Sequence, residues 1–264
     1  SNGYNNKEVS LLKAGDKDSE GNAIMHSFWA PEIHEIDGRL TILFMAGYGN
    51  TWSNGKSVYM QLKQDADGHD LDPTDPDNWT VPTPIYRNDA SLLNGNKQLA
   101  ATASGGVGMS LDMTYFQDAD GRSYYAWQQL GATYIATMDP KDPAHVTSSP
   151  VRIVTPEYAW NAAIAEGPNV TMRDGKLYLM FSGSGVGKTY TTGLAVADAA
   201  GSDLTDPASW TALNYPIQKS GPFNGEMQLG TGHGMWSEDE DMCWTRTATR
   251  STCSMLMLRR TSAP

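Results

Sequence analysis

Polar turns followed by short runs of alternating apolar residues recur along the chain. Three of these turns contain Asp-Gly, at Asp37-Gly38, Asp120-Gly121 and Asp174-Gly175. The runs behind them, rich in strand-forming side chains, are 40–45, 123–127 and 177–181, with a weaker copy at 238–244. An Asp-Gly turn ahead of an alternating run indicates a β-hairpin. No segment has a long helical period, and only residues 156–163 predict a short helix or loop, so the pattern predicts an all-β fold.

A second element repeats out of phase with these hairpins. Residues 75–80 (DPDNWT) closely match 206–211 (DPASWT), and 142–147 (DPAHVT) lie between them. The steps are 67 residues (75 to 142) and 64 residues (142 to 206). A sequence repeat that consists of strands and recurs at a regular spacing is typical of propeller blades. We therefore expect a single propeller domain over residues 1–264, with roughly four repeats and the first of them incomplete.

Charge and composition narrow the classes of partner. The net charge is −11 and the sequence pI is about 4.8, which disfavours nucleic acid and anionic membranes as partners. No apolar run approaches the length of a membrane span. Trp and Tyr, at 8 and 12 residues against 5 Phe, suit stacking on sugars, although ordinary filling of β-sheets is the commoner cause of this bias. The sequence does not begin with a signal peptide. Because Ser1-Asn2-Gly3 resembles a trimmed start, this says little about whether the protein is exported.

Glu166 is the clearest candidate for chemistry. It stands in Ala165-Glu166-Gly167-Pro168, at a rigid corner just ahead of a predicted strand. A carboxyl that is partly desolvated there keeps its proton near neutral pH, as a general acid requires. Asp112 also precedes an Asp-Gly hairpin, where a polar residue at a strand start either caps a turn or points into a central funnel.

Two further segments have open alternatives. Trp29, in Phe28-Trp29-Ala30-Pro31-Glu32, offers a flat face to a sugar, or else it is a core residue beside a buried and paired Glu32. His233 stands among the glycines of 230–234, which indicate a close backbone approach to a ligand or a strand. A lone His is more often structural than a ligand.

Together these segments resemble glycoside hydrolase family 43, the five-bladed propellers that include arabinofuranosidases, xylosidases and arabinanases. The resemblance runs from Trp29 to about Arg250 and is strongest to exo-acting α-L-arabinofuranosidases. The segments that carry it are 29–34, 110–112, 134–138, 165–168, 206–210 and 230–233. The resemblance implies an all-β, five-bladed β-propeller whose first blade is incomplete here.

The resemblance also implies an activity. It is the inverting hydrolysis of terminal α-L-arabinofuranosyl, or β-xylosyl, linkages in plant polysaccharides, which requires no cofactor. Glu166 matches the general acid, and Asp112 matches the carboxylate that orients and tunes it. An inverting enzyme keeps its acid and base about 6.5 to 9.5 Å apart to leave room for a water.

Further site residues follow from the same resemblance. Trp29 and Trp127 are expected to contact the sugar, and Arg246 is expected to bind substrate or pair with Asp112. His233 matches a residue at the funnel floor, near which some members hold a metal ion, so a calcium or sodium ion is expected there. The substrate is expected to be an arabinose- or xylose-containing oligosaccharide or polysaccharide, and the location secreted or periplasmic.

One expected part is missing from the sequence. The family base lies in an Asp-Pro motif well ahead of the Trp-Ala-Pro-Glu motif, but only 28 residues precede Trp29 and none forms Asp-Pro. The five Asp-Pro pairs begin at 72, 75, 139, 142 and 206. We favour the absence of the N-terminal part that carries the base. A base supplied by another segment would also account for the gap, as would a non-catalytic carbohydrate-binding propeller, which is the alternative function.

The chain has two cysteines, Cys243 and Cys253. They face each other if the intervening segment forms a hairpin, and a disulfide and two free thiols are equally compatible with that spacing. Two cysteines alone cannot form a zinc site.

Overall fold

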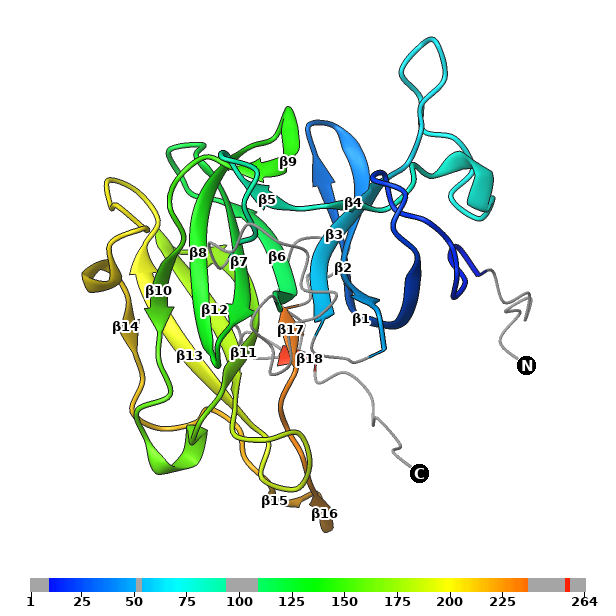
Figure 1. Cartoon of the computed structure of the whole chain (residues 1–264). Helices are drawn as coiled ribbons and strands as arrows, with labels where there is room; N and C mark the ends of the chain where they lie inside the picture. Colours follow the sequence, from blue (N-terminus) through cyan, green and yellow to red (C-terminus); the bar gives the residue numbers. More distant parts are fainter. Residues whose placement is uncertain (1–9, 51–53, 94–108, 237–254, 257–264) are drawn as a thin grey trace. The chain divides into compact units, whose positions relative to one another are not determined.

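The computed structural model describes residues 10–50, 54–93, 109–236 and 255–256 (Figure 1). In these residues every regular element is a β-strand or a three-residue 3-10 helix, as the sequence pattern predicts. The short helices are η2 (Pro76–Asn78), η3 (Ala159–Asn161) and η4 (Pro207–Ser209). No helix in the described part has the length and apolar character that a membrane crossing requires.

The chain divides into two compact units. The first unit is Ser1–Ser110 with Asp139–Val146, and the second is Leu111–Met138 with Thr147–Pro264. The prediction of one domain over residues 1–264 stays a prediction.

One four-stranded antiparallel sheet dominates the first unit. Its strands lie in chain order and are β1 (Ile24–Ile36), β2 (Arg39–Tyr48), β3 (Gly55–Gln61) and β4 (Thr83–Pro84). Its core is Ile24, Phe44, Ala46, Tyr48, Val58, Met60, Leu62 and Trp79. This unit also holds a parallel pair of short strands, β5 (Tyr86–Arg87) and β9 (Asp142–Val146).

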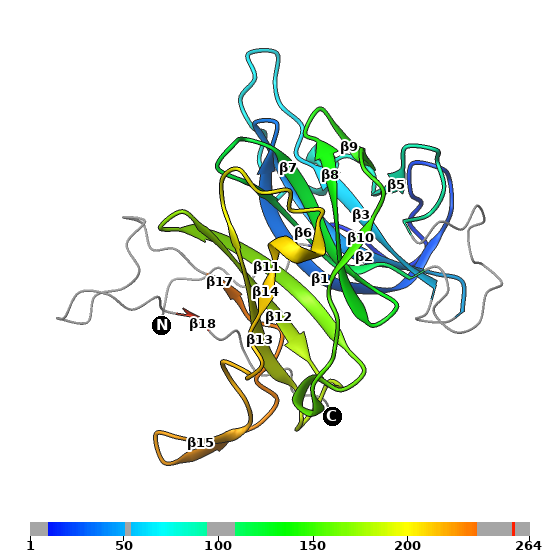
Figure 2. The ribbon, with the colours of Figure 1, turned by 90° about the vertical axis from the view of Figure 1, so that its left-hand side faces the viewer.

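Strands from two sheets form most of the second unit (Figure 2). From the first sheet this unit holds the antiparallel strands β6 (Leu111–Gln117), β7 (Ser123–Gln129), β8 (Ala132–Asp139) and β10 (Val151–Val154). The second is β11 (Ala165–Arg173), β12 (Lys176–Gly183), β13 (Thr191–Asp198) and β14 (Thr211–Ala212). Short pairs follow, namely β15 (Gly221–Phe223) with β16 (Glu226–Gln228) and β17 (Met235–Trp236) with β18 (Met255–Leu256).

A shared apolar core joins the two sheets of the second unit. It contains Phe116, Tyr124 and Ile135 from the first sheet and Leu177, Leu179, Phe181 and Ala195 from the second. Strand β11 also contacts β6 and β7. The starts of β6 and β11, which carry the two candidate acids, therefore belong to one packed body.

The Asp-Gly turns form two kinds of connection. Asp37-Gly38 and Asp174-Gly175 are two-residue hairpin turns in which both residues have positive φ, from 49° to 72°. Such turns match the twist of antiparallel strands. Asp120-Gly121 lies instead within a longer loop, because the side chain of Asp118 accepts the backbone N–H of Asp120 and of Arg122 at 3.0 and 2.8 Å.

The second repeated element is a capped turn in two of its three copies. The side chains of Asp75 and Asp206 accept the backbone N–H two residues later, and Pro begins each 3-10 helix. The indole N–H of Trp79 and of Trp210 then donates to the carbonyl six residues earlier. The copy at Asp142 lies in strand β9 and does not form this turn. It has Val where the two matching copies have Trp, so it lacks the indole that closes the turn.

Three strands, β1, β6 and β11, are irregular near their starts. Register shifts interrupt β1 between Ile24 and Glu32, β6 between Leu111 and Thr114, and β11 between Glu166 and Asn169. Each irregularity contains residues in the left-handed conformation, with φ of 56° at Asp112 and 57° at Gly167. Bulges re-aim nearby side chains and are common beside active sites. Both candidate acids lie at such bulges.

Replacing Asp118 by Ala is expected to lower the free energy of unfolding by about 2–4 kcal/mol. Its carboxylate is buried and also accepts hydrogen bonds from Arg122 Nε at 2.7 Å and from the Tyr124 hydroxyl at 3.0 Å. Urea unfolding measures the change. The control is Asp139→Ala, which removes an exposed carboxylate that caps one backbone N–H. Equal losses in the two variants would contradict the burial argument.

Candidate active site

Glu166 is the second residue of β11 and is buried, with 9% of its surface exposed. It pairs across the sheet with Ser182 at the end of β12. Its pKa is raised from 4.5 to about 6, chiefly by burial and then by the negative charge of Asp112. A carboxyl with this pKa is half protonated at a pH of about 6 and keeps a larger protonated fraction at neutral pH than an ordinary carboxyl does, which suits proton donation.

Asp112 is tied to the backbone that carries Glu166. It is the buried second residue of β6, and its Oδ2 accepts a hydrogen bond from the backbone N–H of Gly167 at 2.9 Å. Gly167 suits this place for two reasons. Its φ of 57° favours glycine, and a Cβ there would lie 3.3 Å from both Ser182 Oγ and His233 Nδ1. Asp112 therefore contacts the backbone amide directly after Glu166.

Tyr190 contacts Glu166 directly, and sequence reasoning missed it. Its hydroxyl donates to Glu166 Oε1 at 2.5 Å, and this bond lowers the pKa of Glu166 against the effect of burial. Burial, followed by the charge of Glu166, raises the pKa of Tyr190 well above its ordinary value. The phenol therefore keeps its proton and acts as a donor.

The glycine-rich segment around His233 supports this contact. The backbone N–H of Thr231 donates to the carbonyl of Tyr190 at 3.0 Å, and that of His233 donates to Ser182 Oγ at 2.5 Å. A Cβ on Gly232 would lie only 2.3 Å from the Tyr190 ring. The prediction that these glycines allow close backbone approach is confirmed: the neighbour is Tyr190. His233 is exposed and lowers the pKa of Glu166 electrostatically.

Comparison with known proteins identifies the family. The sequence profile described as Glycosyl hydrolases family 43 matches residues 2–252. This chain belongs to that family.

Curated proteins similar to this chain include arabinofuranosidases. The "Extracellular exo-alpha-(1->5)-L-arabinofuranosidase" of Streptomyces avermitilis is 28% identical over 223 residues, which are 81% of this chain and 40% of that protein. "Alpha-L-arabinofuranosidase 43" of Humicola insolens is 29% identical over 224 residues, with 81% and 40% coverage. The chain thus spans about two fifths of the length of these two relatives.

Solved structures of the family agree with the fold. An alpha-L-arabinofuranosidase from Lactobacillus brevis has a TM-score of 0.64 and 26% identity, over 83% of this chain and 67% of that chain. Such family 43 structures are five-bladed propellers, and about half of the residues that the structure describes lie in strands. The predicted all-β propeller class is confirmed.

Trp127 does not suit the sugar contact expected for this family 43 chain. Its side chain is fully buried in β7, its indole N–H donates to Gln129 at 3.1 Å, and its ring stacks on Tyr134. The expectation is corrected, because a ring without an exposed face cannot stack on a ligand.

Trp29 lies in the first unit and has the exposure that a sugar contact requires, at 45%. Glu32 is largely buried and pairs with His34 at 2.8 Å, so the alternative interpretation holds for Glu32 but not for Trp29. The role of Trp29 in binding stays a prediction. Arg246, Cys243 and Cys253 lie outside the described residues.

The metal expected near His233 also stays a prediction. Across the described ranges, one group of three potential ligand side chains lies close together, Asp65, Asp67 and His69. It does not include His233. All three side chains are exposed, and Asp65 also caps its own loop through the backbone N–H of Asp67 and of His69, at 2.9 Å each. This group is therefore explained as a capped surface turn.

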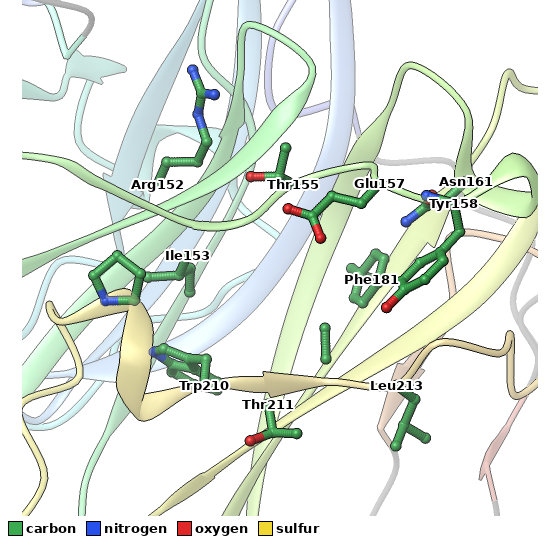
Figure 3. A pocket seen from close by; sticks show the side chains of 12 residues that line it. Arg152, Ile153, Thr155, Glu157, Tyr158, Asn161, Phe181, Trp210, Thr211 and Leu213 are labelled. Atoms are coloured by element: carbon green, nitrogen blue, oxygen red, sulfur yellow. The ribbon is translucent and has the colours of Figure 1, made fainter.

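A separate pocket of about 420 Å³ opens beside η3 and β14 in the second unit (Figure 3). Arg152, Glu157 and Tyr158 supply polar groups to its lining, and Phe181 and Trp210 supply apolar surface. None of the acid network borders this pocket, so the proposed chemistry does not use it.

Proposed function

We propose that the protein removes terminal α-L-arabinofuranosyl units, or secondarily β-xylosyl units, from plant polysaccharide with inversion. The observation that carries this is the buried Glu166, whose pKa is raised to about 6 beside Asp112. The exo-arabinofuranosidase named among its relatives supports arabinose as the sugar, and the word "extracellular" in that name supports secretion.

In the proposed reaction Glu166 donates its proton to the glycosidic oxygen as the bond from that oxygen to the sugar breaks. Water adds to the opposite face of the sugar and loses a proton to a general base. Asp112 holds the backbone next to Glu166 through the Gly167 amide, and its charge helps keep Glu166 protonated. Because Asp112 is committed to that amide, we assign it the orienting role and not the role of base.

The configuration of the first product tests this function. Proton NMR during hydrolysis of 4-nitrophenyl α-L-arabinofuranoside is expected to show β-L-arabinofuranose before mutarotation, since inversion changes the anomer. Contaminating hydrolases are controlled for by comparing the native protein with Glu166→Gln on an arabino-oligosaccharide, whose leaving group needs the proton of Glu166. An α product appearing first would overturn inversion, and cleavage of the β-xyloside alone would overturn the choice of arabinose.

A binding-only propeller is the second function considered. It has no need for a carboxyl whose pKa is raised by burial and a neighbouring acid, so the Glu166 environment favours catalysis. Calorimetry with arabino-oligosaccharides separates the two functions. Heat of binding without release of arabinose would favour the binding protein.

A further inference from the structure

The two oxygens of Glu166 have different surroundings. Oε1 accepts the Tyr190 hydroxyl at 2.5 Å, and both side chains are buried. In a neutral carboxylic acid the carbonyl oxygen is the acceptor and the second oxygen carries the proton. Because the phenol occupies Oε1 as a donor, the proton of the neutral acid belongs on Oε2.

We propose that Tyr190 is a positioning residue that assigns the transferable proton to Oε2 of Glu166. The inference rests on the proposed function, in which Glu166 is the general acid. During the reaction the Oε2–H bond breaks, an O–H bond forms on the departing glycosidic oxygen, and Glu166 is left as a carboxylate. The Tyr190 hydrogen bond strengthens as that charge develops, because hydrogen bonds to ionised acceptors are stronger. It therefore stabilises the transition state more than the ground state.

The position of Tyr190 is fixed by its neighbours. Its carbonyl accepts from Thr231, its ring lies against the bare Cα of Gly232, and the next residue, Thr191, begins β13. The glycines of segment 230–234 are thus explained by the close approach of Tyr190, without a metal ion. It holds the phenol against the acid.

Tyr190→Phe removes the hydroxyl and keeps the ring. Loss of the donor is expected to raise the pKa of Glu166 above its value of about 6, measured by carbon-13 NMR of the labelled carboxyl. Tyr178→Phe is the matched control. Tyr178 lies on the same sheet and pairs with Thr171, away from the Glu166 end of β11.

Kinetics supply a second readout. The Tyr190→Phe variant is expected to lose about 10-fold in kcat with a natural arabino-oligosaccharide, since a hydrogen bond to a charged group is lost. The loss is expected to be smaller with a 4-nitrophenyl glycoside, whose leaving group needs little protonation. A purely structural role would lower both rates equally.

Gly232→Ala tests the same contact without removing the hydroxyl. Its added methyl would meet the Tyr190 ring at 2.3 Å and displace it, so the same rise in pKa and the same leaving-group dependence are expected. Gly234→Ala is the control, because its methyl would meet only the flexible Met180 side chain at 3.3 Å.

The outcomes separate this inference from the proposed function. If Glu166→Gln keeps full activity on the arabino-oligosaccharide, the function itself fails. If Glu166→Gln is inactive but Tyr190→Phe and Gly232→Ala leave both the Glu166 pKa and the leaving-group dependence unchanged, the positioning role alone is overturned. The NMR titration needs no turnover, so it decides the pKa effect in either case.

Discussion

Replacing Glu166 by Gln is expected to lower kcat/KM for arabino-oligosaccharides by about 10²- to 10⁴-fold. Gln has nearly the same shape but cannot give up a proton to the glycosidic oxygen. The loss is expected to shrink for 4-nitrophenyl glycosides, because their leaving group departs without protonation. Steady-state rates on both substrates measure the effect.

The pH dependence follows from the protonated form being the active one. In the native protein the rate is expected to fall as the pH rises through about 6, where Glu166 loses its proton. The Glu166→Gln variant has no such group, so its residual rate is expected to lack this alkaline limb. An unchanged limb in the variant would contradict the assignment of Glu166.

The free energy of unfolding is expected to depend on pH through the same ionisation of Glu166. Folding raises the pKa of Glu166 from 4.5 to about 6, so the folded state holds this proton more tightly than the unfolded state. That contribution is fully present below pH 4.5 and is lost as the pH rises through 6, a change of about 2 kcal/mol. The Gln variant lacks this loss, and urea unfolding at about pH 4 and about pH 7 measures it.

Glu157→Gln is the matched control for both measurements. It is the same substitution on an exposed side chain of the same unit, bordering the separate pocket. It is expected to leave the catalytic rate and the pH dependence of stability unchanged. A comparable loss of activity in this control would show that the effect does not depend on the buried acid.

Replacing Asp112 by Asn is the second change with a large expected effect. It is expected to lower kcat/KM by about 10²-fold. The Asn carbonyl can still accept the Gly167 N–H, so the backbone contact is kept while the negative charge is removed. Because that charge raises the pKa of Glu166, its removal is expected to lower this pKa and move the alkaline limb to lower pH. Rate profiles from about pH 4 to about pH 8 measure the shift.

Asp174→Asn is the control for this substitution. Asp174 also has positive φ, at 49°, but lies in the exposed hairpin turn at the far end of β11. It is expected to leave the rate profile in place. An Asp112→Asn profile that coincides with that of the native protein would remove Asp112 from the tuning role.

The parts of the fold that depend on local chemistry were predictable from the sequence. Asp-Gly at residues 37–38 and 174–175 forms the expected hairpins because both positions need positive φ. The repeat at Asp75 and Asp206 forms the same capped turn, since Asp, Pro and Trp supply its hydrogen bonds. The copy at Asp142 departs because it lacks the Trp.

The candidate site was predictable where a side chain stands beside a backbone irregularity. Glu166 is followed by Gly-Pro, and Asp112 interrupts an apolar run, so both were visible. Tyr190 was not visible, because no local signal separates it from the remaining tyrosines and its partner is distant in sequence. The expectation that Trp127 contacts sugar was wrong because all seven residues of β7 are buried. The alternating pattern of the sequence does not show that a strand is covered on both faces.

The bulge in β11 separates two tasks within a single strand. Residues after it, from Asn169 onward, keep regular pairing with β12, while Glu166 and Gly167 before it follow a different backbone path. Side-chain changes at the acid end therefore need not disturb the regular ladder beyond it. The catalytic end of the strand can therefore change in sequence while the paired part keeps the sheet stable.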